Sequence, residues 1–501
     1  MMKRLTLLVL ILLLSLKIWS QQVVEFTRID QNGVAKTIRT DRPDTLSSLM
    51  QSKLFARSAQ SNDQLVFANK TDSVLYEKVN KEMLQLMRVG NENKVLDSLM
   101  DMYRQIRERS IGTRKVYRPH PEFFPADSLS FEKDKSLIIS LSISNTRITS
   151  LPKSLFECTE LEELELVNTS VRKLPRKLRK LKKLRAVYIY NNRTSQPLVL
   201  RKNTSVDRLV IRGEDPSKLP ARYKAFRNLR YLDLSYNNLT GFPKGTARNK
   251  KLVELILSNN KINLEKDIIV LHPTLEKLDL GKNKISHVPS SIQQFPNLKL
   301  LKFNHNQITV VDPAIGKLTK LEQLSFYSNQ LKSIPTGALA LQNLKEIDLY
   351  YNEIEKVEPA IAQWKRLEIL YLAFNKIYSL PQQWDSLTQL RELYLHNNRI
   401  SSIPSSIGSL PQLHTLRINN NLLTEIPGSL QQLQLLEYLD VSNNSIHLFP
   451  LNPLQFPKLK ILSLVANAWE TETKTSLIAQ TKSLREKGVV VHLNSFDESI
   501  E

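Results

Sequence analysis

A unit of 23 residues repeats along most of this 501-residue chain. One complete copy runs from Leu390 to Gln412 and reads, in numbered slots, L-x-x-L-x-L-x-x-N-x-I-x-x-I-P-x-x-I-x-x-L-x-x. Every interval between units is 23 residues except the one from Asn192 to Glu214, which is 22. A fixed period of this length predicts stacked repeat units. Slot nine is usually Asn and marks fifteen units, at Thr146, Thr169, Asn192, Glu214, Asn237, Asn260, Asn283, Asn306, Asn329, Asn352, Asn375, Asn398, Asn421, Asn444 and Asn467.

The residue type in each slot has a physical reason. The alternation in Leu393-Tyr394-Leu395 has the period of a β-strand, which turns the leucines to one face and the tyrosine to the other. One unit cannot bury its own apolar face, so neighbouring units must share a core. The Asn in slot nine follows the strand, where a buried amide must find hydrogen-bond partners. Pro in slot fifteen suits the start of a short helical turn.

This pattern resembles the leucine-rich repeat family over about residues 138–470. The 23-residue length with Leu-Pro or Ile-Pro at slots 14 and 15 is similar to the Scribble-like and Ras-pathway scaffold subclass. The resemblance implies an α/β solenoid shaped like a horseshoe, with a parallel β-sheet on the concave face and short helical or 3₁₀ segments on the convex face. It also implies a ladder of bonds from the slot-nine Asn to the backbone of adjoining repeats. Thr146, Thr169 and Glu214 depart from Asn, so we expect the N-terminal end of the ladder to be less regular.

Residues 1–20 are expected to form a secretory signal peptide. Lys3 and Arg4 precede an apolar run, and a small residue, Ser20, follows it. The run is short for a membrane span, so we expect no transmembrane span after signal removal; an uncleaved N-terminal anchor is the alternative. The single cysteine, Cys158, excludes a disulfide framework and suits a core position. The chain resembles an exported bacterial protein, located in the periplasm, at the cell surface or outside the cell.

The segment between the signal and the repeats has two predicted parts. Residues 21–70 are polar and weakly patterned, which predicts a poorly ordered segment. Residues 71–134 are expected to hold a helical hairpin and a connector, because apolar residues recur at helical spacing on both sides of Gly90 and Asn91. We interpret the hairpin as an N-terminal cap on the first repeat; a dimerisation module is the alternative.

The fifteen repeats are assigned to residues 135–470 and a C-terminal cap to residues 471–501. The cap is predicted to contain an amphipathic helix from Thr471 to Lys487, ended by Gly488, and then a strand that extends the sheet. Within the repeats, Trp364 and Trp384 occupy core slots, which predicts packing roles for both side chains.

Units nine to twelve carry aromatic residues in slots that face the concave side. Slots 3, 5 and 7 point there and slot 8 lies at its rim, on a face that fifteen strands make about 70 Å long. Clustered aromatics are typical of recognition surfaces, and cross-strand stacking that stabilises the sheet is the alternative. We predict a protein partner bound by this set and two flanking charged residues: Tyr327, Asp348, Tyr350, Tyr351, Tyr371, Phe374, Tyr394, His396 and Arg417.

The chain is strongly basic, with a net charge of +22, or +19 after loss of Lys3, Arg4 and Lys17 with the signal. Such an excess favours anionic partners, here an anionic glycan or glycolipid; solvated lysines on a soluble solenoid are the alternative. The densest stretch keeps its core slots apolar and is predicted to bind anions on its outer face through Arg172, Lys173, Arg176, Lys177, Arg179, Lys180, Lys182, Lys183 and Arg185. Export and the lack of a nucleic-acid motif argue against a nucleic-acid partner.

The sequence carries no motif for catalysis, a cofactor or a metal. A phosphate loop, a nucleophile elbow and a paired-cysteine zinc motif are all missing. His305 and His396 lie four units apart, too far to share a metal ion. We therefore predict no enzyme but a non-catalytic protein-binding or scaffold protein of the cell envelope or exterior. The alternative is an adhesin or envelope-anchoring protein that recognises anionic glycan or glycolipid through basic loops.

Overall fold

A computed structural model of the chain describes residues 134–246, 249–264 and 272–493, together with five shorter strand segments. The chain divides into two compact units, Met1–Phe123 and Phe124–Glu501. The predicted signal peptide and most of the predicted helical hairpin lie outside the described residues. In the first unit, two antiparallel pairs that the sequence did not predict are described: β1 (Val24–Ile29) with β2 (Ala35–Thr40), and β3 (Ser61–Phe67) with β4 (Ser110–Tyr117).

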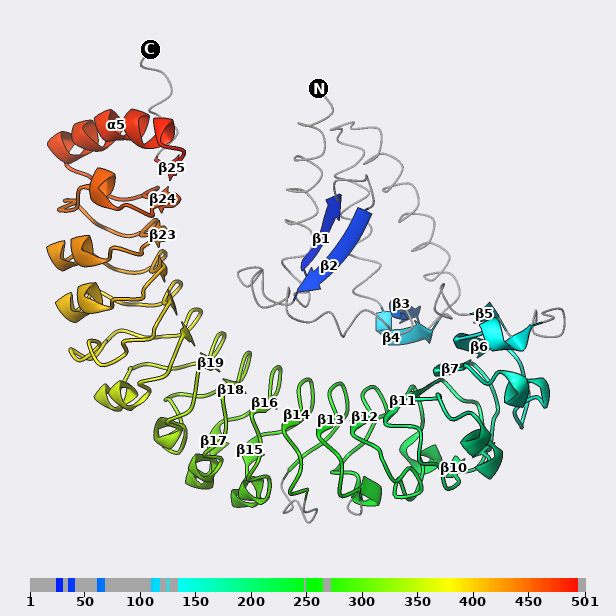
Figure 1. The fold of residues 1–501 in the computed structure, drawn as a ribbon. Helices are drawn as coiled ribbons and strands as arrows, with labels where there is room; N and C mark the ends of the chain where they lie inside the picture. The colour runs from blue at the N-terminus through cyan, green and yellow to red at the C-terminus, as the bar shows by residue number, and fades with distance from the viewer. Residues whose placement is uncertain are drawn as a thin grey trace. The chain divides into compact units, whose positions relative to one another are not determined.

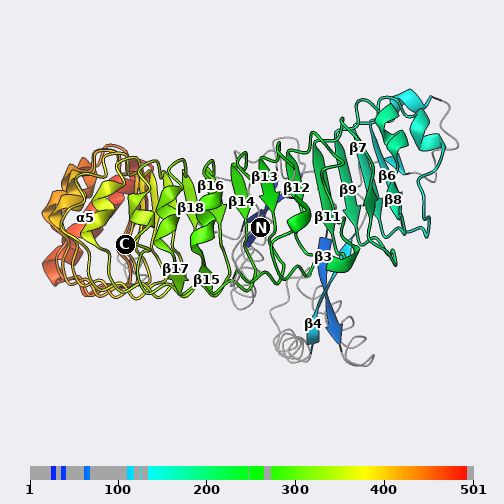
Figure 2. The same ribbon diagram turned by 90° about the horizontal axis from the view of Figure 1, so that it is seen from below.

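The second unit is an open solenoid built on one parallel sheet (Figures 1 and 2). Each strand pairs with the next in the sheet, and the two end strands, β5 and β25, each have one neighbour among the described strands. The predicted α/β solenoid is confirmed. The strands are β5 (Phe124–Pro125), β6 (Ser140–Ser144), β7 (Glu163–Val167), β9 (Ala186–Tyr190), β11 (Arg208–Arg212), β12 (Tyr231–Asp233), β13 (Glu254–Ile256), β14 (Lys277–Asp279), β16 (Leu300–Lys302), β18 (Gln323–Ser325), β19 (Glu346–Asp348), β20 (Ile369–Tyr371), β21 (Glu392–Tyr394), β22 (Thr415–Arg417), β23 (Tyr438–Asp440), β24 (Ile461–Ser463) and β25 (Val490–His492).

The outer side of the arc carries short 3₁₀ segments, as predicted (Figure 1). Two short strand pairs also lie outside the main sheet: β8 (Lys173–Leu174) with β10 (Val199–Leu200), and β15 (His287–Val288) with β17 (Val310–Val311). The 3₁₀ segments are η2 (Lys135–Leu137), η3 (Ser154–Glu157), η4 (Arg176–Lys180), η5 (Pro216–Lys218), η6 (Lys244–Thr246), η7 (Ser290–Gln294), η8 (Pro313–Lys317), η9 (Ala338–Ala340), η10 (Pro359–Gln363), η11 (Ser405–Ser409), η12 (Gly428–Gln432) and η13 (Pro453–Gln455).

The apolar slots of successive units form one continuous core. Leu390, Leu393 and Leu395 are fully buried in it, and so are the equivalent residues of most other units. Trp364 and Trp384 lie in the same core, which confirms their predicted packing roles. Cys158 is also buried there, and burial raises the pKa of its thiol. A buried thiol with a raised pKa is a weak nucleophile, so Cys158 is a packing residue.

The slot-nine asparagines form the predicted ladder from Asn260 to Asn467. Asn306 shows the pattern: its Nδ2 donates to the carbonyl oxygens of Phe303 (2.9 Å) and Leu280 (3.0 Å), and its Oδ1 accepts from the N–H of Ile285 at 3.0 Å. Leu280 and Ile285 belong to the preceding unit, so each amide joins two units. The same bonds recur at Asn352, Asn398 and the other units of this range. The ladder satisfies buried backbone groups that the three-residue strands leave unpaired.

The N-terminal part of the ladder is less regular, as predicted. Thr169 donates its hydroxyl to Oδ1 of Asn192 at 3.0 Å. In the next unit, a carboxyl oxygen of Glu214 accepts from the N–H of Asn192, and the N–H of Glu214 donates to Oδ1 of Asn237 at 2.9 Å. Burial raises the pKa of Glu214 to about 8, because the site offers its charged form too little solvation. The structure therefore holds this carboxyl protonated at neutral pH.

The C-terminal cap has the predicted form. Helix α5 (Thr471–Glu486) buries Leu477, Thr481 and Leu484, and Gly488 follows it in the left-handed region at φ +81°. Strand β25 then pairs in parallel with β24 and covers the last repeat. Across the described residues, none of the helices has the length and apolar character needed to span a membrane.

The ladder predicts a local sensitivity to amide removal. Asn306→Ala leaves the buried N–H of Ile285 without its partner, at a cost of about 1–3 kcal/mol. It also removes one of the two amide donors from the carbonyl oxygens of Leu280 and Phe303, which keep their bonds from Asn283 and Asn329. Urea unfolding followed by circular dichroism should show a clearly lower midpoint than wild type. The neighbouring exposed variant Gln307→Ala is the control and should leave the midpoint unchanged. Equal midpoints for the two variants would contradict the ladder.

Glu214 predicts a pH dependence of stability. Its pKa is near 4.5 in an unfolded chain and about 8 in the folded one, so the folded state retains a proton that the unfolded state releases. Stability should therefore fall as pH rises from 4.5 to 8, by about 1.4 kcal/mol for each unit of pKa shift. In Glu214→Gln this loss is absent. The measurement is the difference in unfolding free energy between the two proteins at pH 5 and pH 8; a difference that does not change with pH would contradict the prediction.

Candidate partner-binding surface

Several predicted binding residues lie in one row on the inner face of the sheet. The strand register aligns Ser325, Asp348, Tyr371, Tyr394 and Arg417 across β18, β19, β20, β21 and β22. Adjacent positions of each strand point to opposite faces, and the residue before each of these is a core residue. The row therefore faces away from the core, as the sequence predicted.

The rings of units nine to twelve form a cluster separate from the leucine core. Tyr371 and Tyr394 stack with 4.9 Å between ring centroids, and Tyr351 and Phe374 stack at 4.2 Å. We call these seven residues the aromatic cluster: Tyr327, Tyr350, Tyr351, Tyr371, Phe374, Tyr394 and His396. The small residue Ala373 packs with them. The register thus brings together every aromatic residue that the sequence singled out.

Tyr350 lies at the centre of the aromatic cluster. Its ring centroid lies 5.4 Å from that of Tyr371 and 5.5 Å from that of His396. Its hydroxyl lies 3.4 Å from Nε2 of His396, two units further along the chain. Ala373 holds the equivalent slot in the intervening unit, and its small side chain leaves room for this reach. A larger residue at 373 would separate Tyr350 from His396.

Charged groups flank the stacked pair on both sides. Asp348 accepts from Oγ of Ser325 at 2.7 Å and from the N–H of Tyr350 at 3.2 Å. On the other side, Nε of Arg417 lies 3.8 Å from Oδ2 of Asp440. The row therefore runs acid, ring, ring, base across four neighbouring strands. The predicted contact of Asp348 with a partner was wrong, because its side chain is fully buried and accepts hydrogen bonds within the protein. Arg417 keeps part of its side chain exposed and can orient a partner at that end of the row.

Slot 8 takes a left-handed backbone in every unit. Its φ lies between +51° and +60° in fourteen units and is +78° at Gly213. Asn fills this slot in seven units and tolerates the conformation, whereas a bulky ring does not. Tyr236, Tyr351 and Phe374 nevertheless occupy it, at φ +60°, +53° and +53°, at a cost on the order of 1 kcal/mol per residue; the last two stack on each other. Two stacked rings in an unfavourable conformation indicate a role beyond backbone geometry.

The expected exposure of the cluster was wrong for five of its members. Tyr327, Tyr350, Tyr371, Tyr394 and His396 each expose 4% or less of their surface. Rings from neighbouring units pack against one another, which is the cross-strand stacking given above as the alternative. The half-buried members are Tyr351 and Phe374, which lie in slot 8.

The sequence did not include His305 in this surface. Its ring lies 5.0 Å from that of Tyr327 in an edge-to-face arrangement, which extends the row of rings by one unit. A signal was present, since His305 occupies slot 8, like Tyr351 and Phe374. Asn304 and Asn419 flank the cluster in slot 7, and the buried Oδ1 of each has no hydrogen-bond partner among the residues that the structure describes.

The basic stretch lies apart from the aromatic cluster, on the second and third units. All nine of its cations are exposed, while the core slots between them are buried. Lys183 pairs with Glu160, and Nζ of Lys177 lies 4.7 Å from the ring centroid of Phe156. The predicted outward orientation is confirmed for Arg172, Lys173, Arg176, Lys177, Arg179, Lys180, Lys182, Lys183 and Arg185.

Neither surface resembles a metal centre. No group of three or more His, Cys, Asp or Glu side chains within the described residues is arranged to hold a metal ion. His305 and His396 lie at opposite ends of the aromatic cluster and take part in ring packing. The chemistry that this surface offers is contact through rings, amides and flanking charges.

Comparison with known families agrees with the fold. A family model described as Leucine rich repeat matches residues 273–331, 319–377, 365–423 and 388–446, and a second one matches residues 228–249. The chain is a leucine-rich repeat protein. No curated protein sequence matches it.

Solved structures share the solenoid of this leucine-rich repeat protein. A leucine-rich repeat protein of Leptospira interrogans is 25% identical, with a TM-score of 0.53, and the match covers 74% of this chain and 99% of that one. The Toll–Spatzle complex of Drosophila is 20% identical, with a TM-score of 0.54; the match covers 66% of this chain and 50% of that one. The second likeness is one of fold alone.

The slot-8 rings predict a near-neutral effect on stability. In Tyr351→Asn/Phe374→Asn, relief of the unfavourable backbone offsets the lost ring stacking, which is worth about 0.5–1.5 kcal/mol. The unfolding free energy should therefore stay within about 1 kcal/mol of wild type. The core truncation Leu349→Ala is the comparison and should cost about 2–5 kcal/mol. If the double variant loses as much as the core truncation, the rings are needed for folding, and their assignment to binding loses its basis.

Proposed function

We propose that this leucine-rich repeat protein is a non-catalytic binding protein whose concave aromatic cluster contacts a protein partner. The observation that carries the proposal is the pair Tyr351 and Phe374, two stacked rings held in a left-handed backbone where Asn is the favourable residue. They keep part of their surface open, while the buried ring of Tyr350 packs against both, with centroids 6.1 Å from Tyr351 and 6.2 Å from Phe374. Aromatic residues in well-packed surroundings provide much of the binding energy at protein interfaces.

The flanking charge of Arg417 supports a protein as the partner. Arg417 borders the rings on one side and keeps part of its side chain exposed, whereas Asp348 on the other side is fully buried and does not contact a partner directly. An apolar centre with a polar rim is the usual composition of a protein-binding patch. In the Toll–Spatzle complex, a chain of this fold occurs with a protein partner. That likeness is limited to the fold, so the proposal depends on the residues of this chain.

The proposed site of action is the cell envelope or the exterior of a bacterial cell. This part depends on the basic and apolar start of the chain, residues 1–20, which has the pattern of a secretory signal. N-terminal sequencing of the mature protein tests it and should find the first residue near Gln21. A mature chain that begins at Met1 or Met2 would favour the uncleaved anchor.

The binding proposal is tested by capture followed by affinity measurement. The full-length protein is used to capture partners from an envelope extract, and the partner identified is then purified and titrated. Tyr351→Asn/Phe374→Asn should weaken its affinity by about tenfold or more, because each lost ring contact is worth about 1–2 kcal/mol. Tyr378→Ala is the matched control, since Tyr378 is an exposed ring in slot 12. Equal affinities for the wild type and the double variant would contradict the proposal.

A second candidate is recognition of anionic glycan or glycolipid by the basic stretch. Nine exposed cations favour it, of which Lys183 alone makes an ion pair, with Glu160, within the described part of the chain. This function would make the protein an adhesin or an envelope anchor. The discriminating variant replaces Arg176, Lys177, Arg179 and Lys180 by Glu. If the second candidate is correct, this variant loses capture of the partner, wild-type capture weakens steeply with salt, and the slot-8 double variant behaves like wild type.

A further inference from the structure

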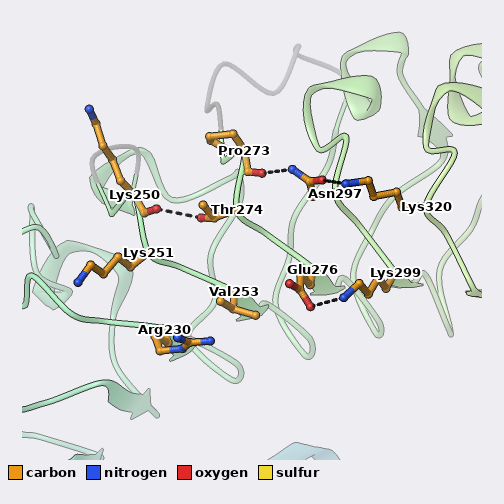
Figure 3. A pocket seen from close by; sticks show the side chains of 10 residues that line it. All are labelled: Arg230, Lys250, Lys251, Val253, Pro273, Thr274, Glu276, Asn297, Lys299 and Lys320. Atoms are coloured by element: carbon orange, nitrogen blue, oxygen red, sulfur yellow. Dashed lines mark hydrogen bonds and ion pairs between the residues drawn. The ribbon is translucent and has the colours of Figure 1, made fainter.

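A groove of about 550 Å³ lies at the edge where the chain enters strands β12, β13, β14 and β16 (Figure 3). Its walls come from slots 22, 23 and 2 of units five to eight, so neither the aromatic cluster nor the basic stretch contributes to it. A volume of this size lies within the range of small-molecule sites. The sequence analysis did not identify it.

The hollow results from two small residues in unit six. Slot 2 holds Arg230, Glu276 or Lys299 in neighbouring units but Val253 in unit six. Slot 23 of the same unit holds Thr274. Because adjacent strands lie about 4.8 Å apart, two short side chains next to each other leave a gap between long ones. Figure 3 shows these long side chains on both sides of Val253 and Thr274.

The groove carries an uncompensated positive charge. Five cations and one carboxylate line it, and that carboxylate, Glu276, already pairs with Lys299 at 3.0 Å. The ammonium groups of Lys251 and Lys320 donate to the side-chain oxygens of Asn228 (2.8 Å) and Asn297 (2.6 Å). These amides hold the two lysines in place without neutralising them. An anion placed in the groove would therefore meet oriented cations.

Arg230 and Lys250 complete the cationic lining. Within the part of the chain that the structure describes, neither side chain makes an ion pair or a hydrogen bond. The guanidinium of Arg230 can bind a sulfate or phosphate group through two parallel N–H bonds. Lys250 adds a separate point charge, and Figure 3 shows its side chain directed away from Arg230. Both donors are available for a ligand.

Part of the groove lining is apolar. Val253 and Pro273 contribute hydrocarbon surface to the lining. The hydroxyl of Thr274 donates to the carbonyl oxygens of Lys250 (3.1 Å) and Leu252 (2.8 Å), so its proton is engaged within the protein. A lining that combines apolar side chains with cations fits a ring that has a hydrocarbon face and anionic substituents.

The backbone around the groove offers no strand edge to a peptide. The N–H of Val253 donates to the carbonyl of Arg230, and the N–H of Glu276 donates to that of Val253, each at 2.8 Å. A peptide could not extend the sheet here, because these donors are already used. Recognition must therefore come from side chains that contact substituents on a compact ligand.

We propose that this groove is a binding site for an anionic sugar, a saccharide that carries sulfate or phosphate groups. The anionic groups bind Arg230, Lys250 and Lys251, and the ring lies against Val253 and Pro273. This assignment does not depend on either function proposed above, because it uses different residues.

The test is calorimetric titration of the full-length protein with a sulfated disaccharide. We expect one site per chain, binding that weakens as salt is raised, and an affinity about tenfold or more above that of the same disaccharide without sulfate. Arg230→Gln/Lys250→Gln/Lys251→Gln should lose most of this affinity. The matched control is Arg391→Gln/Lys365→Gln/Arg366→Gln, which removes three cations from the same slots of other units and should bind like wild type.

A further variant tests the shape of the groove separately from its charge. Val253→Gln keeps every cation and fills the gap with a long neutral side chain, which slot 2 accommodates in neighbouring units. Its affinity for the sulfated disaccharide should fall about tenfold, while its thermal unfolding stays like that of wild type. The proposal is overturned if Val253→Gln binds normally or the control triple variant loses as much as the groove variant. It is also overturned if inorganic pyrophosphate or an acidic peptide of equal charge binds as tightly as the sulfated disaccharide.

Discussion

The hydrogen bonds of the slot-nine asparagines connect each repeat to the one before it. Strands of three residues pair too few backbone groups to hold a sheet, and the turns that follow them are buried. The side chains of Asn306 and its equivalents form hydrogen bonds with carbonyl and N–H groups that the backbone of these turns does not pair. Since the leucines of one unit are covered only by those of the next, the core and the ladder depend on the same stacking. The helix and strand that end the chain cover the last unit of both.

The core and the ladder use the apolar slots and slot nine, so the remaining slots can hold different residues in different units. Each surface described above consists of such residues. The aromatic cluster fills slots 5, 7 and 8 of four units with rings, including Tyr351 and Phe374 in a backbone that favours Asn. The groove arises in slots 2 and 23, where Val253 and Thr274 replace long side chains. The core slots beneath both surfaces keep their leucines. The solenoid therefore allows recognition surfaces to change with little effect on packing.

Much of the fold could be predicted because it depends on a local pattern that repeats. The period predicts the solenoid, slot nine predicts the ladder, and Gly488 predicts the end of the last helix. The burial of Tyr350 and Tyr371 was missed because it depends on how rings of different units pack, which no single unit encodes. The groove was missed for a similar reason, since it requires small residues in two slots of the same unit at once. The raised pKa of Glu214 depends on burial that its neighbours impose.

The central claim is that all units share one interior and one ladder. Hydrogen exchange on the full-length protein tests it most directly, at amides that donate to a slot-nine Oδ1, such as those of Ile285, Leu331 and Ile400. The account predicts strong protection of these amides through the middle units, decreasing smoothly toward both ends of the solenoid. Protection that drops abruptly at a boundary between two middle units would show separate folding blocks and contradict it.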